Sequence, residues 1–266
     1  ADIVFLAGGR SHGPGEHGFK AGSELLAKAI NEQSGLGLKA VVVSGWPKDE
    51  TILDGIKCLV IYADGTSVVG KGWAKVDELA KKGTGIVFMH YAVHPDAKDG
   101  EKYYRPWIGG AFETGWSVNP HWQADFTKLP VHPIANGISP FTTHDEWYFH
   151  MRFKDGMKSV APILSAIPPA GLKLPDGMRS GNAHVRKEVA DRLPQHVSWA
   201  TERADGGRGF GFTGGHNHKN WGNDDQRKVV LNAILWTAKA PVPAIGVQSK
   251  VTPEELLANL DPKGKK

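Results

Sequence analysis

The sequence has almost no cysteine and no long apolar run, and both absences limit what the protein can be. Cys58 is the only cysteine among 266 residues, so no disulfide can form within the chain. Because Cys58 lies inside the apolar run "KCLVIY", we expect it to be buried and unreactive. No stretch reaches the roughly 18 apolar residues of a membrane-spanning helix. The sequence therefore predicts no membrane partner.

Charge is not concentrated anywhere in the chain. The net charge is only +4, and the longest basic run is the terminal "KGKK". No cluster of basic and aromatic residues is present, so we expect no nucleic-acid partner. The chain begins "ADIVFL" without an initiator methionine, which favours an exported protein, periplasmic or secreted, that has lost a signal peptide. A single cysteine does not decide the compartment, so a cytoplasmic location stays open.

Three common catalytic and cofactor motifs are also missing. The sequence contains no Walker phosphate loop, and "GGRSHGPG" after the first apolar run lacks the glycine spacing of a dinucleotide-binding turn. There is no G-x-S-x-G nucleophile turn. The function must therefore depend on other residues.

What is present is a repeated alternation of short apolar runs and helical segments. Apolar runs at 2–7, 38–45, 56–63 and 83–89 end in turns, and helical periodicity follows at 21–33 and 73–83. The same rhythm returns at 196–202, at 207–215 and in a helix from about Asp224 to Ala238. Short continuous runs of β-branched residues are typical of parallel strands buried on both faces. The sequence predicts an α/β fold with a doubly wound, mostly parallel sheet.

Two regions differ from this alternation. Residues from about 96 to 195 are rich in Trp, Pro, Gly and His, and we expect extra strands and long loops there, with extended pieces at 121–126, 145–153 and 159–167. Residues 241–266 read as a C-terminal arm with one short helix that begins at Thr252–Pro253. We therefore divide the chain into an α/β domain, 1–240, and an arm, 241–266. The arm could wrap its own domain or a neighbouring subunit, so a homo-oligomer stays open.

Polar residues gather where the predicted strands end, and the carboxyl ends of parallel strands share one edge of a sheet. A segment outside the alternation, "THDEWYFHMRF", adds Asp145 and Glu146. The residues that follow the strands are His12, Glu16, His17, Tyr62, Asp64, His90, Tyr91, His94, His216, His218, Trp221 and Asp224.

Two chemistries suit such a cluster. Neutral imidazoles with one carboxylate are good ligands for zinc or a similar divalent ion. Histidine and a carboxylate can also act as metal-free general acid and base. His90 could instead be a buried core histidine, and Asn223 or Asp224 reads more readily as the N-cap of the last helix. We expect His218 and His94 to support the site or to lie on the surface.

The tryptophans suggest a ligand class. Nine are present, and Trp107, Trp116, Trp122, Trp147 and Trp221 fall in predicted loops. Flat apolar faces beside hydrogen-bonding groups suit a sugar ring, although any polar cyclic ligand would fit. We expect a small carbohydrate as the partner, bound by Trp116, Trp122, Trp147 and Trp221 together with Tyr91 and Asp64.

Three segments resemble the trehalose-utilisation, or ThuA-like, family: "GIVFMHYAVH", "DEWYFHMRF" and "GRGFGFTGGHNHKNWGNDDQRKVVLNAILWTA". The resemblance covers most of residues 1–240. It implies a flavodoxin-like fold similar to class I glutamine amidotransferases, with the Trp-rich region as an insertion. In amidotransferases a nucleophilic cysteine follows a central strand, and His90 stands at the corresponding position here. Amidotransferase chemistry is therefore not expected.

The resemblance also implies a role in sugar catabolism and a divalent metal held by histidines at the sheet edge. Carried onto this chain, the ligands are His17, His90, Glu146 and His216; the first is ambiguous with His12, and we prefer His17 because it directly precedes a helix. We expect a metal-dependent hydrolase or lyase that acts on glycosides or 3-keto sugars, with His90 and Glu146 catalytic and Asp145 as the nearby acid or base.

Two alternatives stay open. The chain could be a carbohydrate-binding protein of the same fold without catalysis, or a metal-free hydrolase that uses a histidine and an aspartate.

Overall fold

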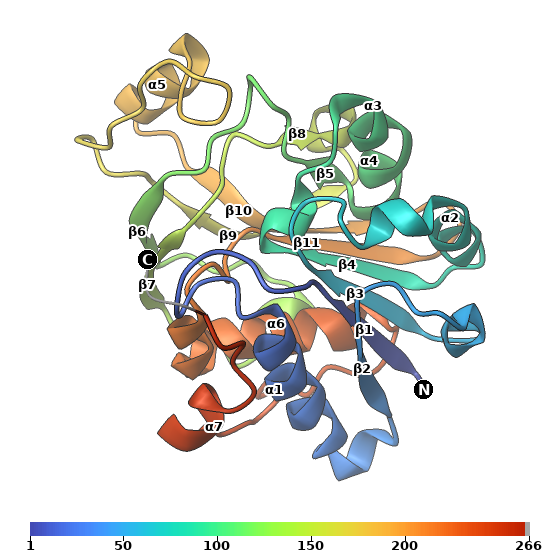
Figure 1. The fold of residues 1–266 in the computed structure, drawn as a ribbon. Helices are drawn as coiled ribbons and strands as arrows, with labels where there is room; N and C mark the ends of the chain where they lie inside the picture. The colour runs from blue at the N-terminus through green and yellow to red at the C-terminus, as the bar shows by residue number, and fades with distance from the viewer. Residues whose placement is uncertain (264–266) are drawn as a thin grey trace.

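The computed structural model describes residues 1–263, and a seven-stranded sheet forms its centre (Figure 1). The strand order is β2-β1-β3-β4-β11-β10-β9. The strands from β2 to β11 run parallel, and β10 is antiparallel to both of its neighbours. The bounds are β1 Ile3–Ala7, β2 Ala40–Ser44, β3 Cys58–Tyr62, β4 Gly85–Met89, β9 Val160–Ala166, β10 Gln195–Glu202 and β11 Arg208–Phe212. The predicted α/β fold with a mostly parallel sheet is confirmed.

The central strands are apolar because helices cover both faces of the sheet. Every residue of β1, β3 and β4 is buried, including the unpaired Cys58, which confirms the expectation for this cysteine. Burial raises the pKa of the Cys58 thiol far above its usual range, so the thiol stays protonated and unreactive.

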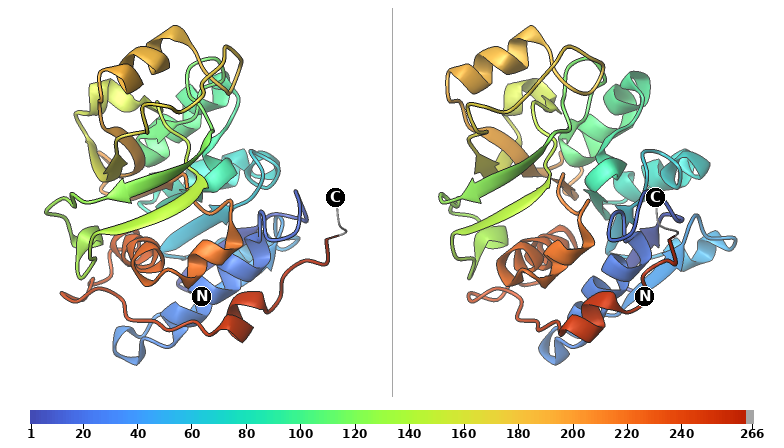
Figure 2. Two further views of the ribbon diagram at one scale, coloured as in Figure 1. Left: turned by 90° about the vertical axis from the view of Figure 1, so that its left-hand side faces the viewer. Right: turned by 60° about the vertical axis from the view of Figure 1, so that its left-hand side comes forward.

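The helices divide between the two faces of the sheet (Figures 1 and 2). One face packs against α1 and α6, and the other against α2 and α4. Among residues 1–263, no helix combines the length and apolar character needed to cross a membrane. The helix bounds are α1 Phe19–Asn31, α2 Trp73–Lys81, α3 Ala97–Asp99, α4 Arg105–Ile108, α5 Ala183–Ala190, α6 Asp224–Thr237 and α7 Pro253–Leu257.

The Trp-rich region builds small sheets beside the main one. Strands β6 (His121–Phe126) and β7 (Phe141–Glu146) pair antiparallel, and β5 (Gly110–Ala111) pairs with β8 (Arg152–Phe153). Residues of β6 alternate strictly between exposed and buried, because one face of this pair packs on the core. The expected strand over 145–153 was wrong: β7 ends at Glu146, and residues 147–151 form a connection before β8.

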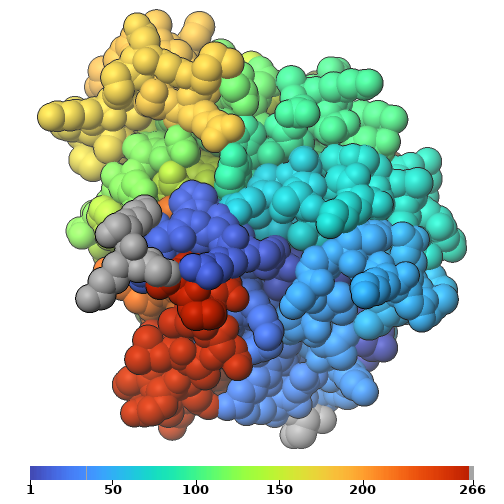
Figure 3. Space-filling model, viewed as in Figure 1, coloured from blue at the N-terminus to red at the C-terminus, as the bar shows by residue number. Residues whose placement is uncertain are grey.

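The C-terminal arm packs on the domain, first against α6, where Val247 donates to Asn232 and Arg227 donates to Ser249, and then against α1 (Figures 2 and 3). Its helix α7 begins with a capping box at Thr252, as the Thr-Pro pair predicted. Glu255 pairs with Lys28 of α1. Farther along, the Lys263 ammonium donates to the backbone carbonyls of Glu16 and His17. The arm therefore reaches the loop that connects β1 to α1.

Candidate metal and catalytic site

Four side chains predicted as metal ligands lie together at the carboxyl ends of the parallel strands. His17 ends the loop after β1, His90 directly follows β4, and His216 follows β11. Glu146, the last residue of β7, approaches from the neighbouring small sheet. Each offers one ligand atom, and these atoms all lie within 4.8 Å of one another. We call these residues (His17, His90, Glu146 and His216) the histidine cluster.

The backbone turns sharply where the cluster forms. His17 and His90 adopt positive φ angles of 45° and 54°, a region that residues other than glycine rarely occupy and that is common at functional sites. At His90 this turn ends the strand and directs the ring to the edge of the sheet. Gly215, at φ 101°, allows the same kind of turn before His216.

Hydrogen bonds fix which nitrogen of each ring carries the proton. His17 Nδ1 lies 2.8 Å from an Asp64 carboxylate oxygen, and His90 Nδ1 lies 2.9 Å from the Thr213 carbonyl oxygen. Both partners can only accept, so both Nδ1 atoms donate, and in the neutral rings each Nε2 carries a lone pair.

The two Nε2 atoms with these lone pairs lie 3.0 Å apart. The Nε2 atom of His17 is also 3.0 Å from Nδ1 of His216. Converging lone pairs repel one another unless a cation or a proton lies between them. The donor set therefore fits a divalent cation, with Asp64 and the Thr213 carbonyl as the outer partners that orient two of its ligands.

Glu146 completes the cluster with a carboxylate. Its Oε2 lies 3.1 Å from His216 Nδ1 and 3.5 Å from His90 Nε2. Asn119 donates to Oε1 at 2.9 Å, and the Tyr148 hydroxyl donates to Oε2 at 3.2 Å. These two donors hold the carboxylate beside the rings.

Burial sets the protonation of the rings. Burial lowers the pKa of His17, with Asp64 acting in the opposite direction, and it lowers the pKa of His90 well below its usual range. Burial also acts to lower the pKa of His216, but the hydrogen bond to Glu146 and the negative charges of Glu146, Asp145 and Glu16 together outweigh burial and raise the pKa. His17 and His90 are thus neutral at pH 7, the form in which imidazole binds metals.

Asp145, expected as the nearby acid or base, lies in a setting typical of a structural carboxylate. Its carboxylate is fully buried and accepts from the backbone N–H groups of Glu146, Gly215 and Asn217 at 2.8–3.0 Å, and from the Asn220 amide at 3.0 Å. With these donors around it, Asp145 fixes the loop that carries His216 and the end of the strand that carries Glu146.

The expected tryptophan platform is wrong for three of its four members. Trp147 and Trp221 are fully buried and Trp122 is 2% exposed, so none has a free face for a sugar. They pack in the core under α6 and the small β6–β7 sheet. Trp116 is half-buried and its ring contacts His150 and the guanidinium of Arg152. By contrast, Asp64 and Tyr91 do lie beside His17.

Other expectations concern residues around the cluster. The choice of His17 over His12 places the buried ring in the cluster. The exposed His12 ring lies beside it, with the ring centroids 3.6 Å apart and the planes tilted by 30°. His218 is not a member of the histidine cluster and supports the site indirectly: its ring donates to the Leu256 carbonyl at 2.7 Å. Asn223 caps α6 through its side chain, as its position predicted.

The sequence interpretation missed several neighbours of Glu146. Tyr148 follows Glu146 by two residues, a spacing that could have indicated the same side of an extended segment. Asn119 and His121 were missed because the pairing of β6 with β7, which sets His121 opposite Glu146, was not predicted. The His121 ring lies 4.8 Å from that of His216.

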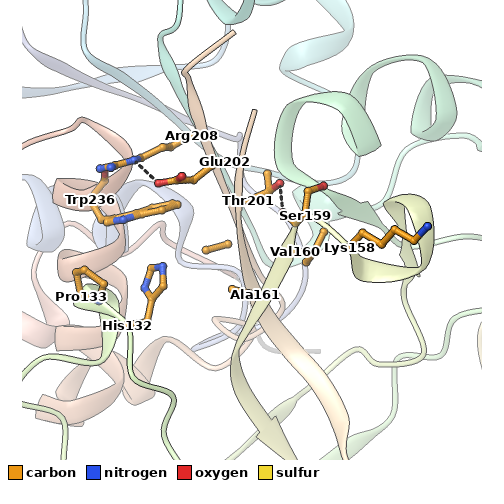
Figure 4. A pocket seen from close by; sticks show the side chains of 11 residues that line it. His132, Pro133, Lys158, Ser159, Val160, Ala161, Thr201, Glu202, Arg208 and Trp236 are labelled. Atoms are coloured by element: carbon orange, nitrogen blue, oxygen red, sulfur yellow. Dashed lines mark hydrogen bonds and ion pairs between the residues drawn. The ribbon is translucent and has the colours of Figure 1, made fainter. Parts of the chain in front are cut away.

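Two pockets lie at opposite ends of the sheet, and they differ in the side chains that line them. A pocket of about 580 Å³ lies at the opposite end, near the start of β11 (Figure 4). Two of its charged groups pair with each other: Arg208 lies 3.3 Å from Glu202, and Arg208 also covers the ring of Trp236. A smaller pocket of about 310 Å³ adjoins the histidine cluster and includes Asp64 and Tyr91. The site therefore lies at the carboxyl ends of the parallel strands.

Comparisons with known proteins agree with this fold. The family model described as "Trehalose utilisation", ThuA, matches residues 9–237. A ThuA-like protein from Bacteroides uniformis has a similar structure, with a TM-score of 0.57 and 15% identity, covering 88% of this chain and 89% of that one. A ThuA-like protein from Parabacteroides merdae gives a TM-score of 0.56 and 16% identity, covering 94% and 92%. The comparison with curated proteins finds no match. Because the family model spans most of the chain and includes His17, His90, Glu146 and His216, the protein belongs to the ThuA family.

Proposed function

We propose that this protein is a metal-dependent enzyme that acts on glycosides or 3-keto sugars. The family description supports a role in sugar utilisation. The observation that carries the metal is the convergence of imidazole lone pairs and a carboxylate within 4.8 Å, with acceptors holding the outer nitrogens of His17 and His90. A divalent ion bound there would polarise a substrate carbonyl or activate water.

The chain's own residues supply the rest of the chemistry. Glu146 is the carboxylate that faces the cluster, and Tyr148 and Asn119 orient it. Burial and Glu146 raise the pKa of Tyr148 well above its usual range, so its hydroxyl keeps its proton and acts as a donor. In a 3-keto glycoside the ketone acidifies the hydrogen on C2, so that a positioned base such as Glu146 takes this proton while the C1–O glycosidic bond breaks. The departing oxygen gains a proton and leaves as an alcohol. Hydrolysis by activated water is the competing reaction.

Metal analysis of the purified protein tests the proposal most directly. We expect about one divalent ion per chain, and loss of turnover of trehalose or 3-keto-trehalose after chelation, restored by adding the ion back. Glu146→Gln should abolish turnover, whereas the matched variant Glu24→Gln, on α1, should behave as the wild type. Protein without bound metal, and activity indifferent to chelation, would refute the metal-dependent proposal.

A metal-free hydrolase is the second candidate, because His17 and Asp64 form a histidine–aspartate pair at 2.8 Å. Activity that survives chelation but is lost in both His17→Ala and Asp64→Asn would favour it. A protein that binds sugar without converting it would bind equally well in the wild type and in Glu146→Gln, with no turnover in either.

A further inference from the structure

The smaller pocket beside the histidine cluster is lined almost entirely by polar groups. We call it the polar chamber; its lining includes Asp64, Thr66, Tyr91, His94, Asp96 and Arg179. The chamber shares a wall with the cluster, because Asp64 accepts a hydrogen bond from His17 and the Tyr91 ring lies 6.3 Å from the His17 ring. A ligand in the chamber would therefore lie directly beside the proposed metal ligands.

One loop from the Trp-rich region closes the chamber. The backbone N–H of Asn119 donates to the Arg179 carbonyl at 3.0 Å, and the N–H of Gly115 donates to the Met178 carbonyl at 2.7 Å. Asn119 is also the residue that donates to Glu146. The loop is thus attached beside Glu146, and the Arg179 side chain crosses to Tyr91 on the other side.

Arg179 is available for a ligand. Its guanidinium donates to the Tyr91 hydroxyl at 3.1 Å, and within residues 1–263 no carboxylate lies within ion-pairing distance of it. A guanidinium has five N–H donors, so most of them remain for a ligand. His94, on the chamber wall, is held by the Thr114 hydroxyl at 2.9 Å.

The polar groups on the chamber wall indicate which class of ligand would fit. Asp64 and Asp96 offer carboxylate acceptors, Arg179 offers donors, and Thr66, Tyr91 and Thr114 offer hydroxyl groups that do both. Two carboxylates against one guanidinium disfavour an anion. The volume of about 310 Å³ is at the small end of the roughly 300–1,000 Å³ of small-molecule sites, which suits one ring rather than two.

We infer that the polar chamber binds one uncharged glycosyl ring through hydrogen bonds to its hydroxyl groups, with Arg179 as the main donor. This inference rests on the proposed function and names its substrate class. The rest of a glycoside would extend past Tyr91 toward the histidine cluster. Recognition depends on hydrogen bonds rather than on stacking, since the tryptophans expected to form a platform are buried or engaged.

Ligand-observed NMR and calorimetric titration test the inference with glucose, trehalose and glucuronate as probes. We expect glucose and trehalose to bind the wild type at least about tenfold more tightly than glucuronate. Arg179→Met should weaken glucose binding about tenfold or more, since it removes charged hydrogen-bond donors, whereas the matched surface variant Arg105→Met should leave it unchanged. Asp96→Asn should recover part of the lost affinity for glucuronate.

The metal content of each variant, measured in parallel, separates this inference from the proposed function. Arg179→Met lies outside the histidine cluster and should keep the metal content of the wild type. If the purified protein holds no metal but binds sugar in an Arg179-dependent way, sugar binding in the chamber is supported and the metal-dependent function is refuted. Three results with metal-loaded protein would refute sugar binding in the chamber without affecting the metal proposal. They are no binding of glucose or trehalose, equal glucose affinity in the wild type and in Arg179→Met, or tighter binding of glucuronate than of glucose.

Discussion

Replacing Asp145 with asparagine distinguishes a structural carboxylate from a catalytic one. Asp145 Oδ1 accepts from the backbone N–H groups of Glu146 and Asn217, and Oδ2 accepts from the N–H of Gly215 and from the Asn220 amide. An asparagine amide group must occupy one of these two positions. In either orientation, at least two donors lose their acceptor and face the new N–H₂ group, and the Asn217 amide, 3.3 Å from Oδ1, is a third on that side.

The size of the effect follows from these lost bonds. Each buried donor left unsatisfied costs about 1–3 kcal/mol, so Asp145→Asn should lower the free energy of unfolding by about 2–6 kcal/mol. For a chain of this length, the lower bound corresponds to a fall in Tm of at least about 4 °C. The side chain is fully buried, so solvent cannot replace the lost bonds. The loop that carries His216 should loosen at the same time, and metal affinity should fall with stability.

Calorimetry and urea denaturation at pH 7 measure this change directly. Asp125→Asn is the matched control, because Asp125 is exposed on β6 and, among residues 1–263, accepts only from Thr142, at 2.7 Å. The unfolding free energy of this variant should stay within about 0.5 kcal/mol of that of the wild type. If Asp145→Asn were as stable as this control but inactive, with an altered pH–rate profile, Asp145 would be an acid or base and the structural argument would be refuted.

Three further predictions concern the site and its surroundings. Asp64→Asn removes the acceptor that orients His17 and should weaken zinc binding about 10- to 100-fold, as measured by competition with a chromophoric chelator; equal affinities would contradict the orienting role. Zinc at 100 times its Kd should stabilise the wild type by about 2.7 kcal/mol in calorimetry, and His216→Ala should lose most of this gain; a Tm that zinc does not change would count against the site. Burial, with Arg179 nearby, lowers the pKa of His94 from 6.5 to about 4, so the unfolded chain binds this proton more readily than the folded one. The free energy of unfolding should therefore fall as the pH drops from about 6.5 to about 4, by at most about 3 kcal/mol. His94→Gln should flatten this part of the stability profile, and identical denaturation midpoints against pH in both proteins would contradict that assignment.

The positions of the cluster ligands could be predicted because they depend on strand ends. Apolar runs followed by turns located β1, β4 and β11, and residues after parallel strands must share one edge of the sheet. His17, His90 and His216 were therefore expected at this edge without any knowledge of side-chain geometry, and the family resemblance then selected them as ligands from the other polar residues there. Glu146 was collected with these residues from the polar segment that carries it, but its role as a ligand required the family resemblance, since no periodicity in the sequence places β7 beside that edge.

The tryptophans and Asp145 could not be assigned because their roles depend on pairing between distant segments. Trp122 and Trp147 lie against the core only because β6 pairs with β7 across a long connection, and an isolated sequence reading gives neither the pairing nor its register. Asp145 lies close to the cluster in the sequence, but its hydrogen-bond donors belong to residues about 70 positions later. Arg179 belongs to a loop whose place over Tyr91 depends on the same kind of long-range contact.

The attachment of the arm to the β1–α1 loop has a consequence for the order in which the site is completed during synthesis. His17 leaves the ribosome long before the arm does, yet the backbone carbonyls of Glu16 and His17 are held by Lys263, about 250 residues later. Contacts of this separation form late, because the chain between them must first be ordered. We therefore expect that, in a nascent chain, the first of the proposed metal ligands is not fixed in place until the arm has emerged. Ion uptake would then follow, rather than guide, the folding of the sheet.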